Sequence, residues 1–379
     1  MNIGILTYHR SINYGAFVQC FALRELVANL FPTDNVEVID YDSIKARKYY
    51  QKYYLRAKSI KDIKYIKTQR RAFFNALDKL HLSDTSLVSD DPSEFGHYIN
   101  RKYDLIIVGS DEIWNVNGLR GFPNPYWLPQ ISGCMKMAFA VSARNEFNSL
   151  LDSQKELMGE YLKDFSFISL RDGVSYETIQ KIVENVPIYR MCDPTMAFDF
   201  NFKIKEGKKL LEDKFGVDPS RPVIGVMDEV GKLSKYISDT YKKEFQIISI
   251  YKNVKGVHNA ADLTPFEWIQ VIGALDGLVT SFFHGMCLAI NANVQFRVYE
   301  YRNIDDPLQS KSFDLLSQYG YEDRYYQMNK GVDFRSDIDT FLKSIIQGKK
   351  NEDFSIIKNG EKEKFKIFQE TIIRIKNGD

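Results

Sequence analysis

The sequence is poor in cysteine, nearly neutral overall and without a long hydrophobic run. Its four cysteines (Cys20, Cys134, Cys192 and Cys287) form no C-x-x-C pair, so their spacing predicts no metal site and favours a reducing compartment. No apolar run approaches the roughly 20 residues that a membrane-spanning helix needs. The net charge of +1 gives no overall argument for nucleic acid as a partner.

Length and composition are typical of a globular protein with more than one domain. The chain has 379 residues, which exceeds the size at which a single hydrophobic core usually stops growing. Because 44% of the residues are hydrophobic and 27% charged, a disordered chain is excluded. The first residues, MNIGILTY, favour a strand over a secretory signal peptide, so we expect a cytoplasmic protein.

Short apolar runs alternate with helical patterns in two successive series. The first series includes NIGILTY, NVEVIDY, YDLIIVGSD and KMAFAVSA, and the second includes PVIGVMD, FQIISIY, GLVTS and QFRVYEY. Alternation of this kind predicts parallel sheets with helices on both faces. We therefore expect an α/β fold with two Rossmann-like domains, over 1–198 and 199–350. The tail 351–379 is expected to form a helix that crosses back to the first domain.

The segment 45–71 interrupts this alternation with a high density of positive charge. It contains eleven Lys or Arg residues, five tyrosines and a single acid, Asp62. We expect it to form helices in an insertion, at about 45–80, within the first domain. For a charge run alone, a solvated helix face is the simpler interpretation. An anionic surface, either acidic lipids at the inner face of the membrane or a lipid-linked phosphate, is the alternative. RNA is a weaker candidate.

Two loops of the first series carry polar residues where a strand ends and ligands of parallel sheets collect. In HRSINYGA, Asn13 and Tyr14 stand at a helix start, where Asn13 either caps the helix or belongs to an anion-binding loop. In VGSDEIWN, Asp111, Glu112 and Trp114 suit sugar hydroxyls and a stacked sugar ring. A simple surface turn is the alternative for this second loop.

Two arginines, Arg144 in SARNEF and Arg171 in SLRDGVS, each follow an apolar run. At the end of a strand, a guanidinium group can bind a carboxylate or a phosphate through two parallel hydrogen bonds. A salt bridge to a neighbouring acid such as Asp172 is an equally good interpretation for either arginine.

The stretch TSFFHG places His284 between an expected strand and an expected helix. The dipole at the helix start disfavours imidazolium, but a phosphate bound beside it would raise the pKa of the histidine. His284 would then be a usable proton donor near neutral pH. The alternative is a packed core histidine beside Phe282 and Phe283. The other four histidines, His9, His81, His97 and His258, have no comparable setting.

Six stretches together resemble polysaccharide pyruvyl transferases. In order, they are GILTYHRSINYGAFVQCFAL, YDLIIVGSDEIWN, SLRDGVS, CDPTMAF, GLVTSFFHGM and SFDLLSQYGYEDR, and the resemblance runs from residue 3 to about 325. It implies a GT-B-like fold with the active site in the interdomain cleft. It also implies phosphoenolpyruvate as the donor co-substrate, with no further cofactor. The acceptor would be a sugar of a bacterial surface polysaccharide or of its precursor, linked to a polyprenyl diphosphate.

The resemblance also assigns roles to single residues. It implies His284 as the general acid and Arg171 as a contact of the donor. From the loops themselves, we expect Ser281, Gly285 and Lys311 on the donor side as well. On the acceptor side we expect Asn13, Tyr14, Asp111, Glu112, Trp114 and Arg144. Many family members have S-R-x-H-G where this chain has Ser281-Phe282-Phe283-His284-Gly285. Phe282 thus replaces a basic residue, and Lys311, Arg297 or Arg302 are candidates to supply that charge.

Two other functions are compatible with the same motifs. A glycosyltransferase or epimerase acting on sugar nucleotides would need a nucleotide-binding loop, for which YKNVKGVHNAADLTPFEW is the candidate, although it contains no clear diphosphate loop. A pseudoenzyme that binds glycan without turnover is favoured by Phe282. A nucleic-acid-binding module ranks third, so we expect no nucleic-acid partner.

Overall fold

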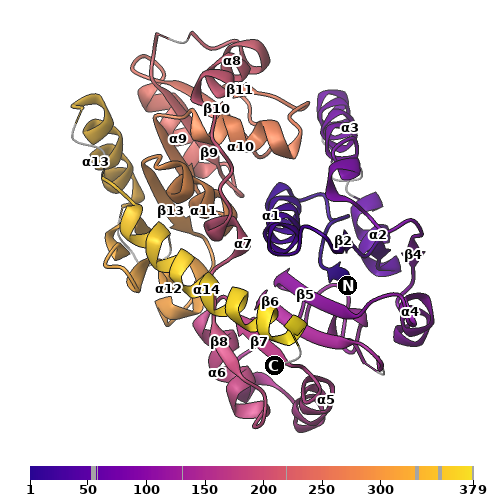
Figure 1. Ribbon diagram of the computed structural model, residues 1–379. Coiled ribbons are helices and arrows are strands. Elements are labelled where there is room, and N and C mark those ends of the chain that lie inside the picture. Colours follow the sequence, from indigo (N-terminus) through magenta and orange to yellow (C-terminus); the bar gives the residue numbers. More distant parts are fainter. Residues whose placement is uncertain are drawn as a thin grey trace. The chain divides into compact units, whose positions relative to one another are not determined.

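The chain forms two compact units, each built around its own six-stranded parallel sheet (Figure 1). The computed structural model describes residues 1–52, 57, 59–129, 131–218, 220–328, 333–348 and 352–377. The first unit comprises 1–56, 77–198 and 361–379, and the second comprises 57–76 and 199–360.

The sheet of the first unit has the strand order β2-β1-β5-β6-β7-β8. Its strands are β1 (Asn2–Leu6), β2 (Asn35–Val38), β5 (Leu105–Asp111), β6 (Met135–Val141), β7 (Phe167–Leu170) and β8 (Ile188–Arg190). A separate two-stranded sheet pairs β3 (Tyr41–Asp42) with β4 (Leu87–Val88). Every residue of β5 is buried, as expected for a central strand that helices cover on both faces.

The helices of the first unit connect these strands. They are α1 (Tyr14–Leu30), α2 (Ile44–Gln51), α4 (Pro92–Ile99), α5 (Asp152–Leu162), α6 (Gly173–Ile182) and α7 (Pro194–Ala197). Its described residues also form the short 3-10 helices η2 (Leu77–Leu80), η3 (Pro125–Trp127) and η4 (Phe147–Ser149).

The second unit repeats the architecture with the strand order β11-β10-β9-β12-β13-β14. Its strands are β9 (Val223–Met227), β10 (Gln246–Ser249), β11 (His258–Asn259), β12 (Gly277–Thr280), β13 (Phe296–Glu300) and β14 (Tyr325–Gln327). Its helices are α8 (Ile204–Phe215), α9 (Lys232–Tyr241), α10 (Pro265–Gly273), α11 (Phe283–Ala292), α12 (Lys311–Ser317) and α13 (Phe334–Ile346), with η5 (Pro307–Gln309) and η6 (Glu322–Arg324).

The basic segment 45–71 is divided between the two units, which corrects the expectation of one insertion in the first domain. Helix α2 belongs to the first unit, but α3 (Ile60–Phe74) is grouped with the second. Three hydrogen bonds hold α3 there, from Tyr65 Oη to the Ala260 carbonyl (3.3 Å), from Gln69 Nε2 to the Tyr251 carbonyl (3.3 Å) and from Asn253 Nδ2 to Asp62 Oδ1 (2.9 Å). Residues 53–56 and 58 lie outside the described part.

The C-terminal helix α14 (Ser355–Asn377) begins in the second unit and continues into the first. In the first unit it crosses β6 and β7 (Figure 1), where Phe368 packs against Phe139 and Phe167 at ring-centroid distances of 4.6 and 5.6 Å. Lys376 near its end pairs with Asp34. Across the described residues, no helix combines the length and the apolar character required to cross a bilayer.

Candidate active site

Arg171 follows β7 and lies at the carboxyl ends of the strands in the first unit. Its Nη2 donates to Asp111 Oδ1 (2.9 Å), and its Nη1 donates to Asp193 Oδ2 (2.6 Å) and Ser110 Oγ (3.2 Å). Burial alone would lower the pKa of Arg171, but the carboxylates of Asp111 and Asp193 raise it. The side chain has no exposed surface. The geometry therefore favours the salt-bridge interpretation of Arg171 over direct contact with a donor, with Asp111 and Asp193 as its partners in place of Asp172.

Asp111 ends β5 in a turn that brings its carboxylate to the edge of the sheet. Its backbone is in the left-handed region, with φ of 86°, and its Oδ1 also accepts from the Glu112 amide (2.8 Å). Gly109 has φ of 123°, and a Cβ there would lie 2.1 Å from the Phe139 carbonyl oxygen. This position near the end of β5 therefore requires glycine.

Glu112 and Arg144 form an ion pair with 3.1 Å between Oε1 and Nη1. Their side chains are 28% and 30% exposed, so both remain accessible to a ligand. The salt-bridge interpretation of Arg144 thus describes the structure, with Glu112 as the partner. The carbonyl of Glu112 also accepts a hydrogen bond from Tyr8 Oη (3.2 Å).

Trp114 is fully buried, so the expectation that it stacks on a sugar ring is wrong in this structure. Its indole lies nearly parallel to Trp127, with 5.1 Å between ring centroids and an angle of 16°. Its Nε1 donates to the Tyr126 carbonyl (3.0 Å). Tyr126 and Trp127 lie in η3 of the same β5–β6 connection, and no periodic pattern in this irregular segment indicates that they pack on Trp114.

Asn13 caps α1, because its Oδ1 accepts from the amides of Gly15 (2.9 Å) and Ala16 (3.3 Å). This is the capping alternative considered for the HRSINYGA loop. Tyr14 is half-buried at the first position of the helix.

Sequence reasoning missed Arg120, whose guanidinium carbon lies 3.6 Å from the centroid of the Tyr8 ring. Its Nη2 donates to Ser11 Oγ (3.0 Å). Burial raises the pKa of Tyr8 to about 12, although the nearby charge of Arg120 acts in the opposite direction. Arg120 lies in a loop without apolar periodicity. No sequence motif around it predicts its contact with Tyr8, which follows the first strand.

His9 and Arg10 were also missed, and both contact Asp40 at the carboxyl ends of β1 and β2. His9 Nε2 lies 3.0 Å from Asp40 Oδ1, while Arg10 Nε and Nη2 donate to Oδ1 and Oδ2 at 2.5 and 2.6 Å. Burial raises the pKa of Asp40, but the hydrogen bonds from His9 and Arg10 outweigh it and lower the pKa to about 2. This buried group joins two loops of the first unit.

In the second unit, His284 lies in the first turn of α11, directly after β12. Its side chain is half-buried, and its imidazole meets the Phe283 ring edge-on with 5.7 Å between centroids. Phe282 occupies the N-cap position, where its amide donates to Thr280 Oγ1 (3.0 Å). The Phe282 ring lies 4.2 Å from that of Tyr251. The structure thus places His284 at a strand–helix junction among aromatic rings.

Ser281 and Gly285 have structural roles on either side of His284. Ser281 Oγ donates to the Met227 carbonyl (3.2 Å) and accepts from the Glu229 amide (3.1 Å), which ties this loop to the end of β9. A Cβ at Gly285 would lie 2.8 Å from both Met227 Sδ and Thr280 Oγ1. Gly285 therefore allows α11 to pack closely on the sheet, instead of leaving open space for a donor.

A model of the polysaccharide pyruvyl transferase family matches residues 13–303, which include the β12–α11 junction with His284. The chain belongs to this family. A comparison with curated proteins gives no significant match.

Two solved structures show the same fold as this pyruvyl transferase family member. UDP-GlcNAc 2-epimerase from Neisseria meningitidis, bound to UDP-GlcNAc, is 11% identical with a TM-score of 0.59, and the alignment covers 99% of this chain and 100% of the epimerase. UDP-GlcNAc 2-epimerase from Methanocaldococcus jannaschii is 11% identical with a TM-score of 0.53, and both chains are fully covered. Both are GT-B enzymes, so the expected GT-B-like fold is confirmed.

Three basic residues were candidates for the charge that the family resemblance places at the position of Phe282. Lys311 begins α12, and its Nζ lies 5.4 Å from the centroid of the Phe283 ring, next to His284. Arg302 instead pairs with Glu300 (2.5 Å), and Arg297 pairs with Asp337 (3.2 Å). Of the three candidates, Lys311 is the one that the structure places against the His284 segment.

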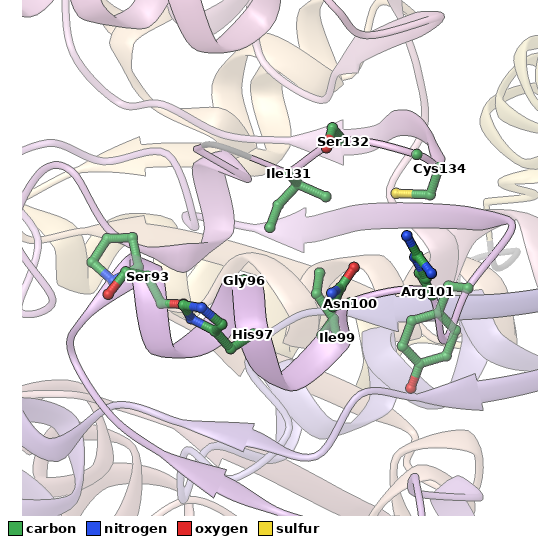
Figure 2. Close-up of a pocket in the computed structure, with 12 residues that line it drawn as sticks. Ser93, Gly96, His97, Ile99, Asn100, Arg101, Ile131, Ser132 and Cys134 are labelled. Atoms are coloured by element: carbon green, nitrogen blue, oxygen red, sulfur yellow. The ribbon is translucent and has the colours of Figure 1, made fainter.

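A cavity of about 230 Å³ lies in the first unit, but at the opposite ends of its strands. Figure 2 shows His97, Asn100 and Arg101 on α4 and the turn after it, and Ile131, Ser132 and Cys134 on the segment that leads into β6. Because these residues precede β5 and β6, the cavity is separate from the loops that contain Asp111 and Arg171. Within the described ranges, no group of three or more His, Cys, Asp or Glu side chains is placed to hold a metal ion.

Proposed function

We propose that the protein transfers the pyruvyl group of phosphoenolpyruvate to a sugar and forms a ketal across two of its hydroxyls. The acceptor sugar belongs to a surface polysaccharide or to its lipid-linked precursor. The observation that carries this proposal is the family match, which includes His284 in the first turn of α11. In this proposal the second unit binds the donor, and loops of the first unit bind the acceptor.

The proposed reaction assigns a proton transfer to His284. One acceptor hydroxyl attacks C2 of phosphoenolpyruvate while the protonated imidazole of His284 delivers a proton to the methylene carbon, which becomes a methyl group. The second hydroxyl then attacks C2, and the C–O bond to phosphate breaks. Of the two hydroxyl protons, one replaces the proton given by His284 and the other leaves with phosphate. The reaction involves no net oxidation or reduction, so it requires no redox cofactor.

The charge of the donor is balanced in the proposal by Lys311 and by the start of α11. The first turn of α11 has no side-chain cap, so its backbone N–H groups and the helix dipole favour an anion. Lys311 adds a full positive charge near Phe283.

The acceptor side of the proposal uses Asp111, Glu112 and Arg144. Carboxylates accept hydrogen bonds from sugar hydroxyls, and the partly exposed Glu112–Arg144 pair can exchange part of its ion pair for such contacts. Arg171 is a positioning residue, because it holds Asp111 and Asp193 without being exposed itself. Asn13 fixes the start of α1, and Tyr14 lies next to it.

The proposal is tested by measuring phosphate release from phosphoenolpyruvate with and without a galactose-containing acceptor. We expect release that depends on both compounds. The fold is also that of enzymes acting on sugar nucleotides, so UDP-GlcNAc is the informative competitor. Consumption of UDP-GlcNAc with no phosphoenolpyruvate turnover would replace the proposal, and binding of phosphoenolpyruvate without any turnover would favour a pseudoenzyme.

A further inference from the structure

Hydrogen bonds connect one face of helix α3 to other segments of the second unit. Tyr65 and Gln69 on this face donate to carbonyls of that unit, and Ile66, Ala72 and Phe73 on the same side of the helix are buried. These contacts fix the rotation of the helix about its axis, and so decide which residues face outward.

The opposite face of α3 combines exposed aliphatic and aromatic residues with basic ones. At 100° per residue, six exposed positions fall on one side of the helix: Ile60, Ile63, Lys64, Lys67, Arg71 and Phe74. Ile60 is 85% exposed, and together with Ile63 and Phe74 it forms an exposed apolar group, which is more informative than a single exposed side chain. We call these six residues the outer face of α3.

Negative charge is missing from the outer face. Asp62 is the only acid between 59 and 74, and it lies on the hydrogen-bonded side, where it accepts from Asn253 Nδ2. A helix that exposes apolar residues between basic ones matches the boundary of an anionic bilayer, since the apolar groups enter the acyl region and the cations meet the headgroups. A purely solvated helix face would not need the exposed isoleucines.

We propose that the outer face of α3 binds the surface of an anionic lipid bilayer. Through Tyr251, the hydrogen-bonded face of α3 is linked to the segment that contains His284. The Tyr251 carbonyl accepts from Gln69, and the Tyr251 ring lies 4.2 Å from Phe282. Docking through α3 therefore brings the β12–α11 loop near the membrane, where a lipid-linked acceptor is located. Only this last consequence rests on the proposed function, because the membrane contact itself does not require it.

The test is co-sedimentation with vesicles of phosphatidylglycerol and phosphatidylcholine, compared with vesicles of phosphatidylcholine alone. The wild-type protein is expected to bind the anionic vesicles and to dissociate as salt rises. The triple variant Lys64→Glu/Lys67→Glu/Arg71→Glu should lower the partition coefficient at least about tenfold, since each basic residue near the surface contributes to binding. Ile60→Ser/Ile63→Ser should also weaken binding while leaving its salt dependence in place.

The matched control reverses three exposed lysines of α8 in the same unit, as Lys205→Glu/Lys208→Glu/Lys209→Glu. This variant has the same net charge as the α3 triple variant and should bind nearly as well as wild type. Equal losses in both triple variants, or no preference of the wild type for anionic vesicles, would overturn the proposal. Circular dichroism verifies that each variant is folded. Turnover of a soluble acceptor is measured separately, so a failure of the membrane contact is distinguishable from a failure of the proposed activity.

Discussion

At the scale of single residues, His284 is a half-buried side chain in the first turn of α11. His284→Gln keeps a similar size but removes the proton donor. We expect turnover to fall by about 10²-fold or more, with a melting temperature close to that of the wild type. The control is His258→Gln, an exposed histidine in the same unit, which should leave turnover unchanged. A stable His284→Gln protein with wild-type turnover would end the catalytic assignment.

Arg171 and Arg144 provide a comparison between a buried and an exposed ion pair. Arg171→Met leaves the carboxylates of Asp111 and Asp193 buried without their partner, so the free energy of unfolding should fall by about 3–5 kcal/mol. Arg144→Met breaks a pair that is about one-third exposed, and should cost less than about 1 kcal/mol. Urea unfolding of both variants measures the difference. Similar costs for the two would show that Arg171 does not hold these carboxylates as the structure indicates.

The lowered pKa of Asp40 predicts how the free energy of unfolding depends on pH. Because folding lowers this pKa from 3.8 to about 2, the group stabilises the folded state fully above about pH 4, and this contribution is lost as the pH falls through about 2. The difference in free energy of unfolding between the wild type and Asp40→Asn should therefore shrink by about 2 kcal/mol over this range. Other carboxylates titrate in both proteins and cancel in the comparison. A difference that does not change with pH would contradict the proposed role of His9 and Arg10.

Local sequence was informative about residues whose role depends on their place along the chain. The change from an apolar run to a helical pattern was enough to place His284 at a strand–helix junction and Asn13 at a helix start, where capping was one of two interpretations. The burial of Trp114 was not predictable, because it depends on how the irregular β5–β6 connection folds Tyr126 and Trp127 back onto it. The same holds for Arg171, whose partners end two other strands.

At the scale of elements, α14 stabilises the first unit through a few large contacts. Phe368 is fully buried against Phe139 and Phe167, so Phe368→Ala should lower the free energy of unfolding by about 3–5 kcal/mol. Its neighbour Ile367 is 39% exposed and serves as the control, since Ile367→Ala should have a much smaller effect. Chemical denaturation monitored by circular dichroism distinguishes them. Equal effects would mean that α14 does not pack on β6 and β7 as described.

The existence of α3 could be predicted from the sequence, but the unit to which it belongs could not. Its charge-rich composition, in a segment that interrupts the strand–helix alternation, was the basis for expecting basic helices there. Its partners, the carbonyls of Tyr251 and Ala260, are 182 and 195 residues away in the chain. Nothing local to the helix indicates such a contact, so the sequence placed the whole segment in the first domain.

At the scale of the whole molecule, the restart of the strand–helix alternation at PVIGVMD was sufficient to predict two α/β units, and the resemblance to polysaccharide pyruvyl transferases implied the GT-B-like fold. Parallel strands covered on both faces are continuous apolar runs, which makes them easy to recognise. The family match and the epimerase structures agree with that prediction. The fold does not identify the substrate, because structures with this architecture include enzymes of different chemistry.

The central claim is that a proton is added to the methylene carbon of phosphoenolpyruvate while a ketal forms on a sugar. The most direct measurement is the NMR spectrum of the product made in D2O from phosphoenolpyruvate and a galactose-containing acceptor. We predict a pyruvate ketal whose methyl group carries one solvent-derived deuterium, formed in step with phosphate release. An acceptor that is recovered unchanged, while UDP-GlcNAc is converted by the same preparation, would contradict the account.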